Sequence, residues 1–407
     1  MVPQTERNAT DGRASDHTRY LAFAGHLQDA GNRYRLLAIG AYGNCSRQAM
    51  NSDQDTFLLL DAAVPEQRAQ WLDLWRLWPA RDVVAHPGYV ELFARPGDRV
   101  VCACQMAKES GILFPLIVRP LCSEPWGRGE EGETCDLVSP YGYGGPFGWG
   151  PYNVEEFWTG FDQWAQTIRA VSLFTRFSLF KDHLIPFFGD TLVKGPCVIV
   201  SLEKPADMLL RSYDKAAREN VRQAERAGVT LEPDPECRRL GEFLTVYYST
   251  MNRHGALPMY YFPKSFFESL IAQLPNQVAL FHALYNQRIV SSELLLISTD
   301  HLYSFLGGTL EEGLRLRANP LLRHGVNLWG KAQGKQQVVL GGGYSGEDSL
   351  LRFKQRYAPN GSVLFSVGAK IFDSHSYQTL IDKRAAWECE QGNQWSPAVA
   401  FFPAYRG

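Results

Sequence analysis

The sequence predicts an α+β protein built from two mixed lobes in tandem, and three observations support this fold class. At 407 residues the chain exceeds the size at which a single hydrophobic core stops growing, so two domains are expected. Hydrophobic residues make up 45% and charged residues 21%, which is enough apolar composition for compact cores. In the second half, two helices precede three antiparallel strands, and helices and strands then alternate, an order unlike a βαβ repeat.

Composition also argues against several classes of protein. The formal net charge of −2 offers no global attraction for a polyanion, so we expect no DNA partner. The eight cysteines include no CxxC pair and no zinc-type histidine spacing, so we expect reduced thiols and no bound metal. The first residues lack the apolar core of a signal peptide, and no stretch approaches the ~18 apolar residues that span a bilayer. We therefore expect a cytoplasmic protein without a membrane span.

Residues 1–16 are polar and are expected to be disordered, and residues 17–202 are expected to form the first lobe. Its first helix is predicted from the helical spacing of Trp71, Leu74, Trp75 and Trp78. Apolar runs of period two then predict a hairpin of two strands around a turn at 108–111. The strands and other elements expected in this lobe are Val100–Met106, Ile112–Val118, Cys135–Val138, a loop at Ser139–Pro146, a helix at Val154–Arg169, and strands at Val171–Phe180 and Cys197–Leu202.

Residues 203–407 are expected to form the second lobe, with a C-terminal helix and tail. A helix from Asp207 to Ala227 is predicted to end at Gly228, because glycine suits the left-handed C′ position. Two apolar runs, Leu294–Ile297 and Leu302–Leu306, flank a turn and predict adjacent antiparallel strands. The other expected elements are a helix at Glu236–Asn252, strands at Val278–Tyr285 and Ile289–Ser298, a helix at Pro320–Lys331, a strand at Val338–Leu340, a helix at Asp348–Arg356 and a strand at Val363–Val367.

Three peptide blocks carry a more specific signal. The first is SPYGYGGP at residues 139–146, and the second is RENVRQAERAG at residues 218–228. The third begins with YSFLGGT at residues 303–309 and continues through Asn319-Pro320 and the glycines at 341–343 to Asp348 and Phe353-Lys354. Together, from about Val83 to the C-terminus, these blocks resemble the FemAB-like branch of the GNAT acyltransferase superfamily, which has two GNAT-like lobes per chain.

The resemblance implies two tandem GNAT-like mixed sheets flanked by helices, with acyl transfer in the second lobe and an acceptor cleft formed with the first. It implies that no cofactor is tightly bound. It also implies that the co-substrate is acyl-CoA, an acyl-carrier protein or an aminoacyl-tRNA. Two departures leave the donor open. The long helical hairpin of the tRNA-using peptidoglycan enzymes has no counterpart between Gly228 and Val278, and Arg315–Pro320 replaces the pyrophosphate loop of simple GNATs.

Glu293 and Tyr303 are the candidate catalytic residues. Glu293 lies among leucines in a predicted strand, where burial would raise the pKa of its carboxyl and suit it to accept a proton from an ammonium acceptor. Tyr303 could protonate a leaving group or hydrogen-bond the acyl carbonyl. The alternatives are a glutamate paired with a neighbouring arginine and a tyrosine with a purely structural hydrogen bond.

The candidate substrate-binding residues come from both lobes. In the glycine-rich loop, the phenols of Tyr141 and Tyr143 could approach a ligand, although a structural turn explains the same residues. Arg211, Lys215, Arg218, Arg222 and Arg226 share one stripe of the helix predicted at 207–227, which suits phosphates, whereas a solvated helix face is the alternative. The full set of candidate binding residues is Tyr141, Tyr143, Arg176, Lys215, Arg218, Arg222, Asn319, Gly342 and Lys354.

Three functions remain open on the sequence alone. The first is transfer of an acyl group from a thioester to an amine of a small molecule, amino sugar or cell-envelope precursor. The second is aminoacyl transfer from a charged tRNA to a peptidoglycan precursor or natural-product amine, for which the basic stripe would supply a cationic track. The third is a non-catalytic scaffold in polysaccharide assembly.

Overall fold

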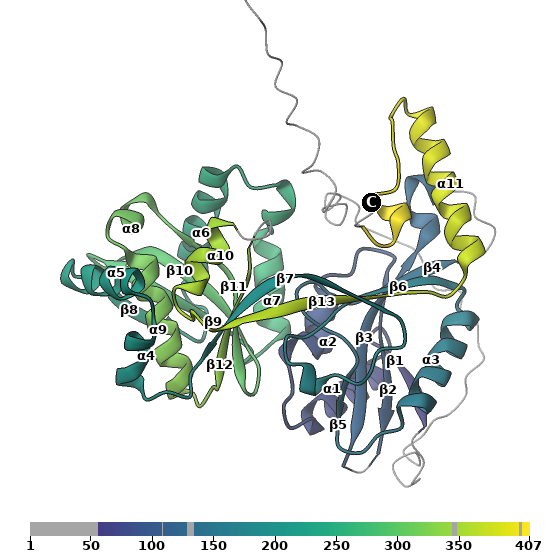
Figure 1. The fold of residues 1–407 in the computed structure, drawn as a ribbon, viewed down its shortest axis with the longest axis horizontal. Helices are drawn as coiled ribbons and strands as arrows, with labels where there is room; N and C mark the ends of the chain where they lie inside the picture. The colour runs from purple at the N-terminus through teal and green to yellow at the C-terminus, as the bar shows by residue number, and fades with distance from the viewer. Residues whose placement is uncertain (1–55, 108, 128–133, 344–347, 399–400) are drawn as a thin grey trace, which may run out of the picture.

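The computed structural model describes residues 56–107, 109–127, 134–343, 348–398 and 401–407. The segment predicted to be disordered, residues 1–16, and Lys108 of the predicted hairpin turn lie outside these ranges. Within them, helices and strands form an α+β protein in which two groups of elements lie side by side (Figure 1). The expected fold class is therefore confirmed.

The first half of the chain forms a sheet covered by helices. Its elements, in chain order, are β1 (Phe57–Asp61), α1 (Pro65–Leu77), the short 3-10 helix η3 (Val83–Ala85), α2 (Pro87–Glu91), β2 (Arg99–Met106), β3 (Gly111–Pro120), β4 (Cys135–Val138), β5 (Phe147–Trp149), α3 (Val154–Thr167), β6 (Ala170–Arg176) and β7 (Asp190–Ser201). Alternate residues of β2 pack on opposite faces of the sheet, with Cys102 and Cys104 in the cluster that holds α1, and Val101 and Ala103 in the cluster that holds α3.

The second half repeats this plan. Its elements are α4 (Ala206–Ser212), α5 (Lys215–Arg226), β8 (Thr230–Asp234), α6 (Leu240–His254), α7 (Lys264–Gln273), β9 (Val278–Tyr285), β10 (Arg288–Ile297), β11 (His301–Thr309), α8 (Glu311–Arg315), α9 (Ala318–Ala332), β12 (Gln337–Gly342), α10 (Ser349–Gln355), β13 (Ser362–Ile371) and α11 (Ser374–Glu390). The expected pairing is confirmed, because Leu294–Ile297 of β10 and Leu302–Leu306 of β11 are antiparallel neighbours.

All thirteen strands of the described residues belong to one continuous sheet. Their order is β1-β2-β3-β4-β6-β13-β7-β12-β11-β10-β9-β8, with β5 paired to β3. Each half contributes an antiparallel run followed by one parallel pair, β4 with β6 and β11 with β12. The last strands are exchanged between the halves: β13 pairs with β6 of the first half, and β7 pairs with β12 of the second. Because β7 and β13 also pair with each other, they form the bridge seen across Figure 1.

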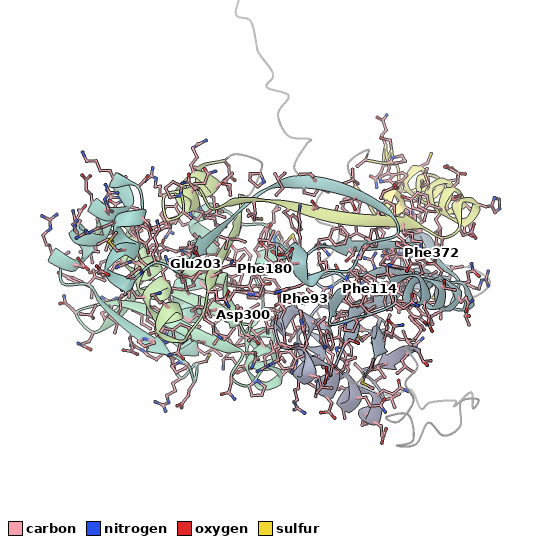
Figure 2. All side chains as sticks on the ribbon, turned by 60° about the horizontal axis from the view of Figure 1, so that its bottom comes forward. Phe93, Phe114, Phe180, Glu203, Asp300 and Phe372 are labelled. Atoms are coloured by element: carbon pink, nitrogen blue, oxygen red, sulfur yellow. The ribbon has the colours of Figure 1, made fainter. Side chains whose placement is uncertain are left out.

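Helices cover both faces of the second half. The pair α5 and α9 packs on one face, and α6 packs on the other, against β10 and β11. A Cβ at Gly308 would lie 2.6 Å from the Val246 carbonyl oxygen of α6, so glycine is what allows this helix to approach the strand. Aromatic side chains fill the junction between the halves, among them Phe93 and Phe180 in Figure 2, which contact Phe266 and His301 respectively.

The helix predicted from Asp207 to Ala227 is broken into α4 and α5. Tyr213 takes an extended conformation, and its buried hydroxyl contacts His324 and Asn327 of α9. The next residue, Asp214, then accepts a hydrogen bond from the Ala217 amide at 2.6 Å and starts α5 as its N-cap. The basic stripe predicted along one helix is therefore divided between two helices.

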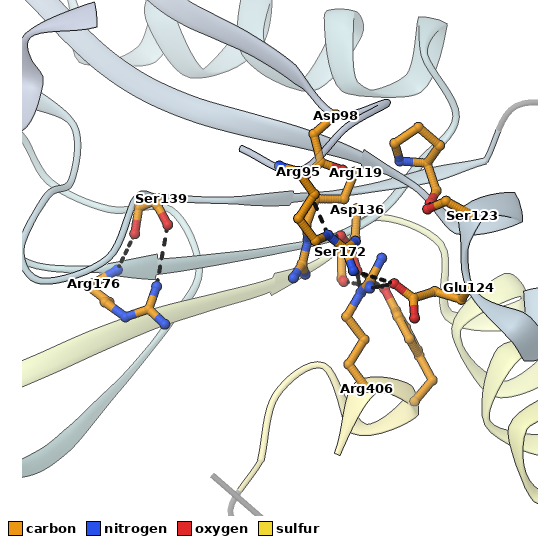
Figure 3. A network of polar contacts seen from close by, with 12 residues as sticks. Arg95, Asp98, Arg119, Ser123, Glu124, Asp136, Ser139, Ser172, Arg176 and Arg406 are labelled. Carbon is orange, nitrogen blue, oxygen red and sulfur yellow. Dashed lines mark hydrogen bonds and ion pairs between the residues drawn. The ribbon is translucent and has the colours of Figure 1, made fainter. Parts of the chain in front are cut away.

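The C-terminal segment, which was expected in the second lobe, packs against the first half instead. α11 packs on β6, and Tyr405 is buried beside Val171. Arg406 forms ion pairs with Asp136 of β4 and with Glu124, as Figure 3 shows. The expected boundary at residue 203 lies just after the end of β7. The packing differs from it, because β13, α11 and the tail lie against the first half.

Candidate active site

A cavity of about 530 Å³ lies in the second half, where two parallel strands separate. β11 and β12 pair over only three residues, ending with Tyr303 opposite Val339, although β11 continues to Thr309. Beyond this point the cavity occupies the space between the strands. Its lining residues are Asn220, Thr250, Arg253, His254, Ser292, Glu293, Ser304, Phe305, Leu306, Gly307, Gly308, Thr309, Gly313, Leu314, Arg317, Asn319, Pro320, Arg323, Leu340, Leu350, Phe353, Lys354 and Arg356.

A bulge in β11 lies at the same place. Leu306 is opposite Leu294 and Ser304 is opposite Leu295, so Phe305 is an extra residue in β11. The extra residue of a bulge is left out of the ladder, and bulges are common beside active sites because they redirect side chains. Here the bulge places both Ser304 and Phe305 along the cavity wall.

Glu293 and Arg323 form the polar centre of the cavity. The Glu293 side chain is 2% exposed and the Arg323 side chain 12% exposed, and the guanidinium donates to Oε1 of the carboxylate. The Ser304 hydroxyl donates to the same oxygen. Within the described part of the chain, Oε2 of Glu293, Nε of Arg323 and Oδ1 of Asn319 have no hydrogen-bond partner. Three residues of the lining thus carry one buried donor and two buried acceptors without a partner among the described residues.

The remaining charges around the cavity are positive. Among the described lining residues Glu293 is the single carboxylate, whereas the cations are Arg253, Arg317, Arg323, Lys354 and Arg356. The first turn of α9, which carries Asn319, adds the partial positive charge of a helix N-terminus. The Lys354 ammonium donates to the Gly342 carbonyl at 2.6 Å. Burial and, second, the positive charge of Arg323 lower the pKa of Lys354 to about 8.

This cavity lies within a segment that matches a known domain. Residues 211–355 match the sequence model of the acetyltransferase (GNAT) domain, and this range contains every residue of the cavity lining except Arg356. The second half carries a GNAT acyltransferase domain. The chain is therefore an acyltransferase, and its cavity lies where β11 parts from β12.

Two solved structures share the fold over about three quarters of this chain. The crystal structure of FemX aligns with a TM-score of 0.57 at 13% identity, covering 77% of this chain and 98% of FemX. A protein of unknown function from Bacteroides thetaiotaomicron aligns with a TM-score of 0.51 at 10% identity, covering 75% and 97% of the two chains. L-PGS from Bacillus licheniformis aligns with a TM-score of 0.45 at 14% identity, covering 79% and 96%. No curated protein matches the chain in sequence.

The GNAT domain match agrees with the resemblance to the GNAT superfamily, and the alignment with FemX shows a shared fold. In the part of the chain that the structure describes, no helix is long and apolar enough to cross a bilayer. Within the same ranges, no three His, Cys, Asp or Glu side chains gather as ligands for a metal ion.

Of the two catalytic candidates, the GNAT domain brings only Glu293 to the cavity. The structure contains the alternative of a glutamate paired with an arginine, because Arg323 and Ser304 bind the carboxylate. The Tyr303 hydroxyl instead donates to Asp82 of the first half at 2.7 Å, outside the lining, and burial raises the pKa of this phenol well above its usual value. A role for Tyr303 in protonating a leaving group does not fit this position.

The two loop tyrosines meet the GNAT domain across the junction without lining the cavity. The Tyr143 ring stacks on Tyr303 with 5.4 Å between centroids, and its hydroxyl lies 3.6 Å from Cys197 Sγ. Tyr141 is 40% exposed, and its ring lies 6.4 Å from that of Phe305, which does line the cavity. Both rings lie near aromatic side chains of β11, but neither tyrosine lines this cavity, which is formed by residues of the second half.

Arg176 holds the glycine-rich loop. Its guanidinium donates to the carbonyl of Ser139 at 3.3 Å and lies over the ring of Phe174, as Figure 3 shows for the contact with Ser139. Its backbone amide donates to the hydroxyl of the same serine at 2.9 Å. Arg176 therefore positions the loop that carries Tyr141 and Tyr143, and it does not reach the cavity.

The basic residues of α5 also lie outside the cavity lining. Lys215 is exposed and lies 3.8 Å from Glu219, Arg218 donates to the Tyr213 carbonyl, and Arg222 is exposed. The residue of this helix that does line the cavity is Asn220. Of the other candidates, Asn319 and Lys354 line the cavity, and Gly342 accepts the hydrogen bond of Lys354.

Arg323 is the main functional residue that the sequence analysis missed. A signal for it was present, because Asn319 and Arg323 are four residues apart at the start of a predicted helix and so share one face. Ser304 could have been noticed as a polar residue within an apolar strand. Arg253 had no such signal, because its position in the lining depends on how α6 crosses β11.

Proposed function

We propose that this chain forms an amide by transferring an acyl or aminoacyl group from an activated donor to an amine, in the cavity where β11 leaves β12. Glu293 is the general base of this reaction. The observation that carries the proposal is the unpartnered oxygen of Glu293, in a cavity whose other charged lining residues are cations.

Glu293 has the geometry of a positioned base. One oxygen is fixed by Ser304 and Arg323, which sets the orientation of the carboxylate. The other oxygen is buried and has no hydrogen-bond partner among the described residues, so its lone pairs are not used by another side chain. Such an arrangement combines a fixed side chain with a free proton acceptor, as general base catalysis requires.

The reaction can be written with each proton accounted for. The amine nitrogen attacks the donor carbonyl carbon, and its proton passes to Oε2 of Glu293. Negative charge develops on the carbonyl oxygen, and the Lys354 ammonium and the amide of Phe305 in the bulge supply donors for it. When the tetrahedral centre collapses, the carbon–sulfur or carbon–oxygen bond to the donor breaks and the leaving group takes the proton from Glu293.

The charge of the cavity favours a donor that carries phosphate. Coenzyme A, the phosphopantetheine of a carrier protein and tRNA all do so, and the five cations of the lining would bind such a group. The acceptors that fit the proposal are amines of small molecules, amino sugars or cell-envelope precursors. The resemblance to the FemAB-like branch keeps an aminoacyl-tRNA as the second candidate donor.

The scaffold alternative has less support. It was favoured if neither Glu293 nor Tyr303 faced a cavity, and Glu293 does line one. A scaffold has no need for a buried carboxylate that keeps one oxygen unpaired, because leaving a buried acceptor unsatisfied costs about 1 to 3 kcal/mol.

The test is to incubate the full chain with acyl-CoAs, acyl-carrier proteins or charged tRNAs and a panel of amines, and to detect amide products by mass spectrometry. We expect a mass gain of one acyl or aminoacyl group on an amine with one class of donor. The Glu293→Gln variant is the control for background aminolysis. Absence of product with every donor, or equal product with the variant, would contradict the proposal.

A further inference from the structure

A buried carboxylate of the first half contacts the short segment through which β11 pairs with β12, beside the cavity. Asp82, at the start of η3, is fully buried and accepts hydrogen bonds from Tyr303 at 2.7 Å and from Ser298 at 2.8 Å. Its Oδ2 also lies 3.2 Å from Nε2 of His301, an ion-pair distance when the ring is protonated. Ser298 lies in the turn that follows β10, and His301 and Tyr303 lie at the start of β11.

The partners of Asp82 include the first and last residues of β11 that pair with β12. The two strands pair only through His301, Leu302 and Tyr303. The first and third of these contact Asp82, and each also contacts an aromatic ring of the first half: His301 lies 4.2 Å from Phe180, and Tyr303 stacks on Tyr143. Residues of the first half therefore contact both His301 and Tyr303, the first and last residues of the paired segment of β11.

The residue that follows Tyr303 already lines the cavity. Ser304 follows Tyr303 in β11 and donates to the carboxylate of Glu293. A shift of Tyr303 would move Ser304 and the bulge at Phe305 with it, and a displacement of about 1 Å in a catalytic group can cost a hundredfold in rate.

Asp82 is held in its charged form by its surroundings. Burial alone would raise the pKa of its carboxyl, but the charge and contact of His301 and the hydroxyls of Tyr303 and Ser298 outweigh it, so the pKa lies below the usual value. A charged acceptor gives shorter and stronger hydrogen bonds than a neutral one, which suits a residue that fixes geometry.

We propose that Asp82 is a positioning residue for the transfer reaction: by holding His301 and Tyr303, it lets the first half set the opening between β11 and β12. This proposal rests on the proposed function for its kinetic consequence, although the coupling between the halves does not depend on it. Asp82 has no place in the cavity lining and acts through Tyr303 and Ser304.

The experiment compares Asp82→Asn with Asp136→Asn. Both carboxylates are fully buried in the first half and pair with a basic side chain, but Asp136 pairs with Arg119 and Arg406, away from the paired segment of β11. We expect Asp82→Asn to lower kcat at least about tenfold, with the donor KM changed less than about twofold. Asp136→Asn should lower the melting temperature and leave kcat, per folded molecule, within about twofold of the parent.

Tyr303→Phe provides a milder variant that removes one hydrogen bond and keeps the ring. It should lower kcat in the same direction, and the double variant with Asp82→Asn should be no slower than Asp82→Asn alone, because both act through one contact. Additive losses in the double variant would overturn the proposed route through Tyr303.

Hydrogen exchange gives a readout that is independent of activity. In Asp82→Asn the amides of residues 303–309 should exchange faster than in the parent, whereas in Asp136→Asn they should not. If no donor supports transfer in the parent, the proposed function fails while this comparison still tests the coupling. Unchanged exchange at residues 303–309, or equal kcat losses in the two Asn variants, would refute the role of Asp82.

Discussion

At the scale of single residues, the two oxygens of Glu293 have different surroundings. We predict that Glu293→Gln lowers kcat by about 10² to 10⁴-fold, because an amide cannot accept the proton of the attacking amine. Ser304→Ala removes a neighbour of the same carboxylate and should cost much less. Rates under saturating donor and acceptor measure both effects. A Glu293→Gln enzyme with the parental kcat would show that the base lies elsewhere.

Lys354 gives a pH dependence whose sign can be stated. Its pKa is lowered from 10.5 to about 8, so the ammonium is lost from the cavity as pH rises through about 8, and kcat/KM should fall there. Lys354→Arg should keep its rate above that pH, because a guanidinium stays charged. The free energy of unfolding should change in the opposite direction and rise with pH. The unfolded chain binds more protons between pH 8 and 10.5, so the contribution of Lys354 to the free energy of unfolding rises over that range.

The identity of the residues in the site was easier to predict from sequence than their contacts. Glu293, Asn319 and Lys354 were expected near the substrate and line one cavity. An arginine partner for Glu293 was one of the alternatives, but the sequence of β10 shows only apolar neighbours, and Arg323 lies thirty positions later. The hydrogen bond of Tyr303 was not predicted, because its partner Asp82 belongs to the other half and lies 221 positions earlier in the sequence.

At the scale of elements, the break between α4 and α5 changes the interpretation of the basic stripe. We predict that replacing Arg218 and Arg222 together with Ala leaves the donor KM within about twofold, because neither residue lines the cavity. Arg317→Asn is the matched cavity variant, since Asn tolerates the left-handed backbone of that position while losing the charge. It should raise the donor KM, and the effect should weaken at high salt. Steady-state KM values at two ionic strengths distinguish the two outcomes.

Most helices and strands were predictable from periodicity, and the helix break was not. Apolar spacing located α9, α10 and the strands β9 to β11 within a few residues. The break at Tyr213 depends on a hydroxyl that finds partners on α9, a contact remote in the sequence. Asp214 carried a local signal, since aspartate is a favoured N-cap, but it lay inside a continuous helical pattern.

At the scale of the whole molecule, the C-terminus closes a buried charge network in the first half. Arg406 pairs with Asp136 and Glu124, and Asp136 also pairs with Arg119 (Figure 3). We predict that Arg406→Ala destabilises the protein by about 3 to 5 kcal/mol, because it leaves buried carboxylates without one of their partners. Denaturant unfolding of the variant measures this. Arg384→Ala on α11, whose partner Glu388 belongs to the same helix, is the control and should cost less.

The exchange of β7 and β13 could not have been predicted from periodicity, because the pattern of a strand does not reveal its neighbour. Both strands were expected near their observed positions and were assigned to the lobe in which they occur along the chain. Pairing places each in the sheet of the other half.

This exchange also determines when each half can be completed during synthesis. The edge of β6 is covered by β13, which leaves the ribosome about 190 residues later. At ~5–20 residues per second that interval lasts roughly 10 to 40 seconds. Until then the nascent first half has an unpaired strand edge of the kind that other chains can join. Whatever protects that edge in the cell has to act before the last residues of the chain are made.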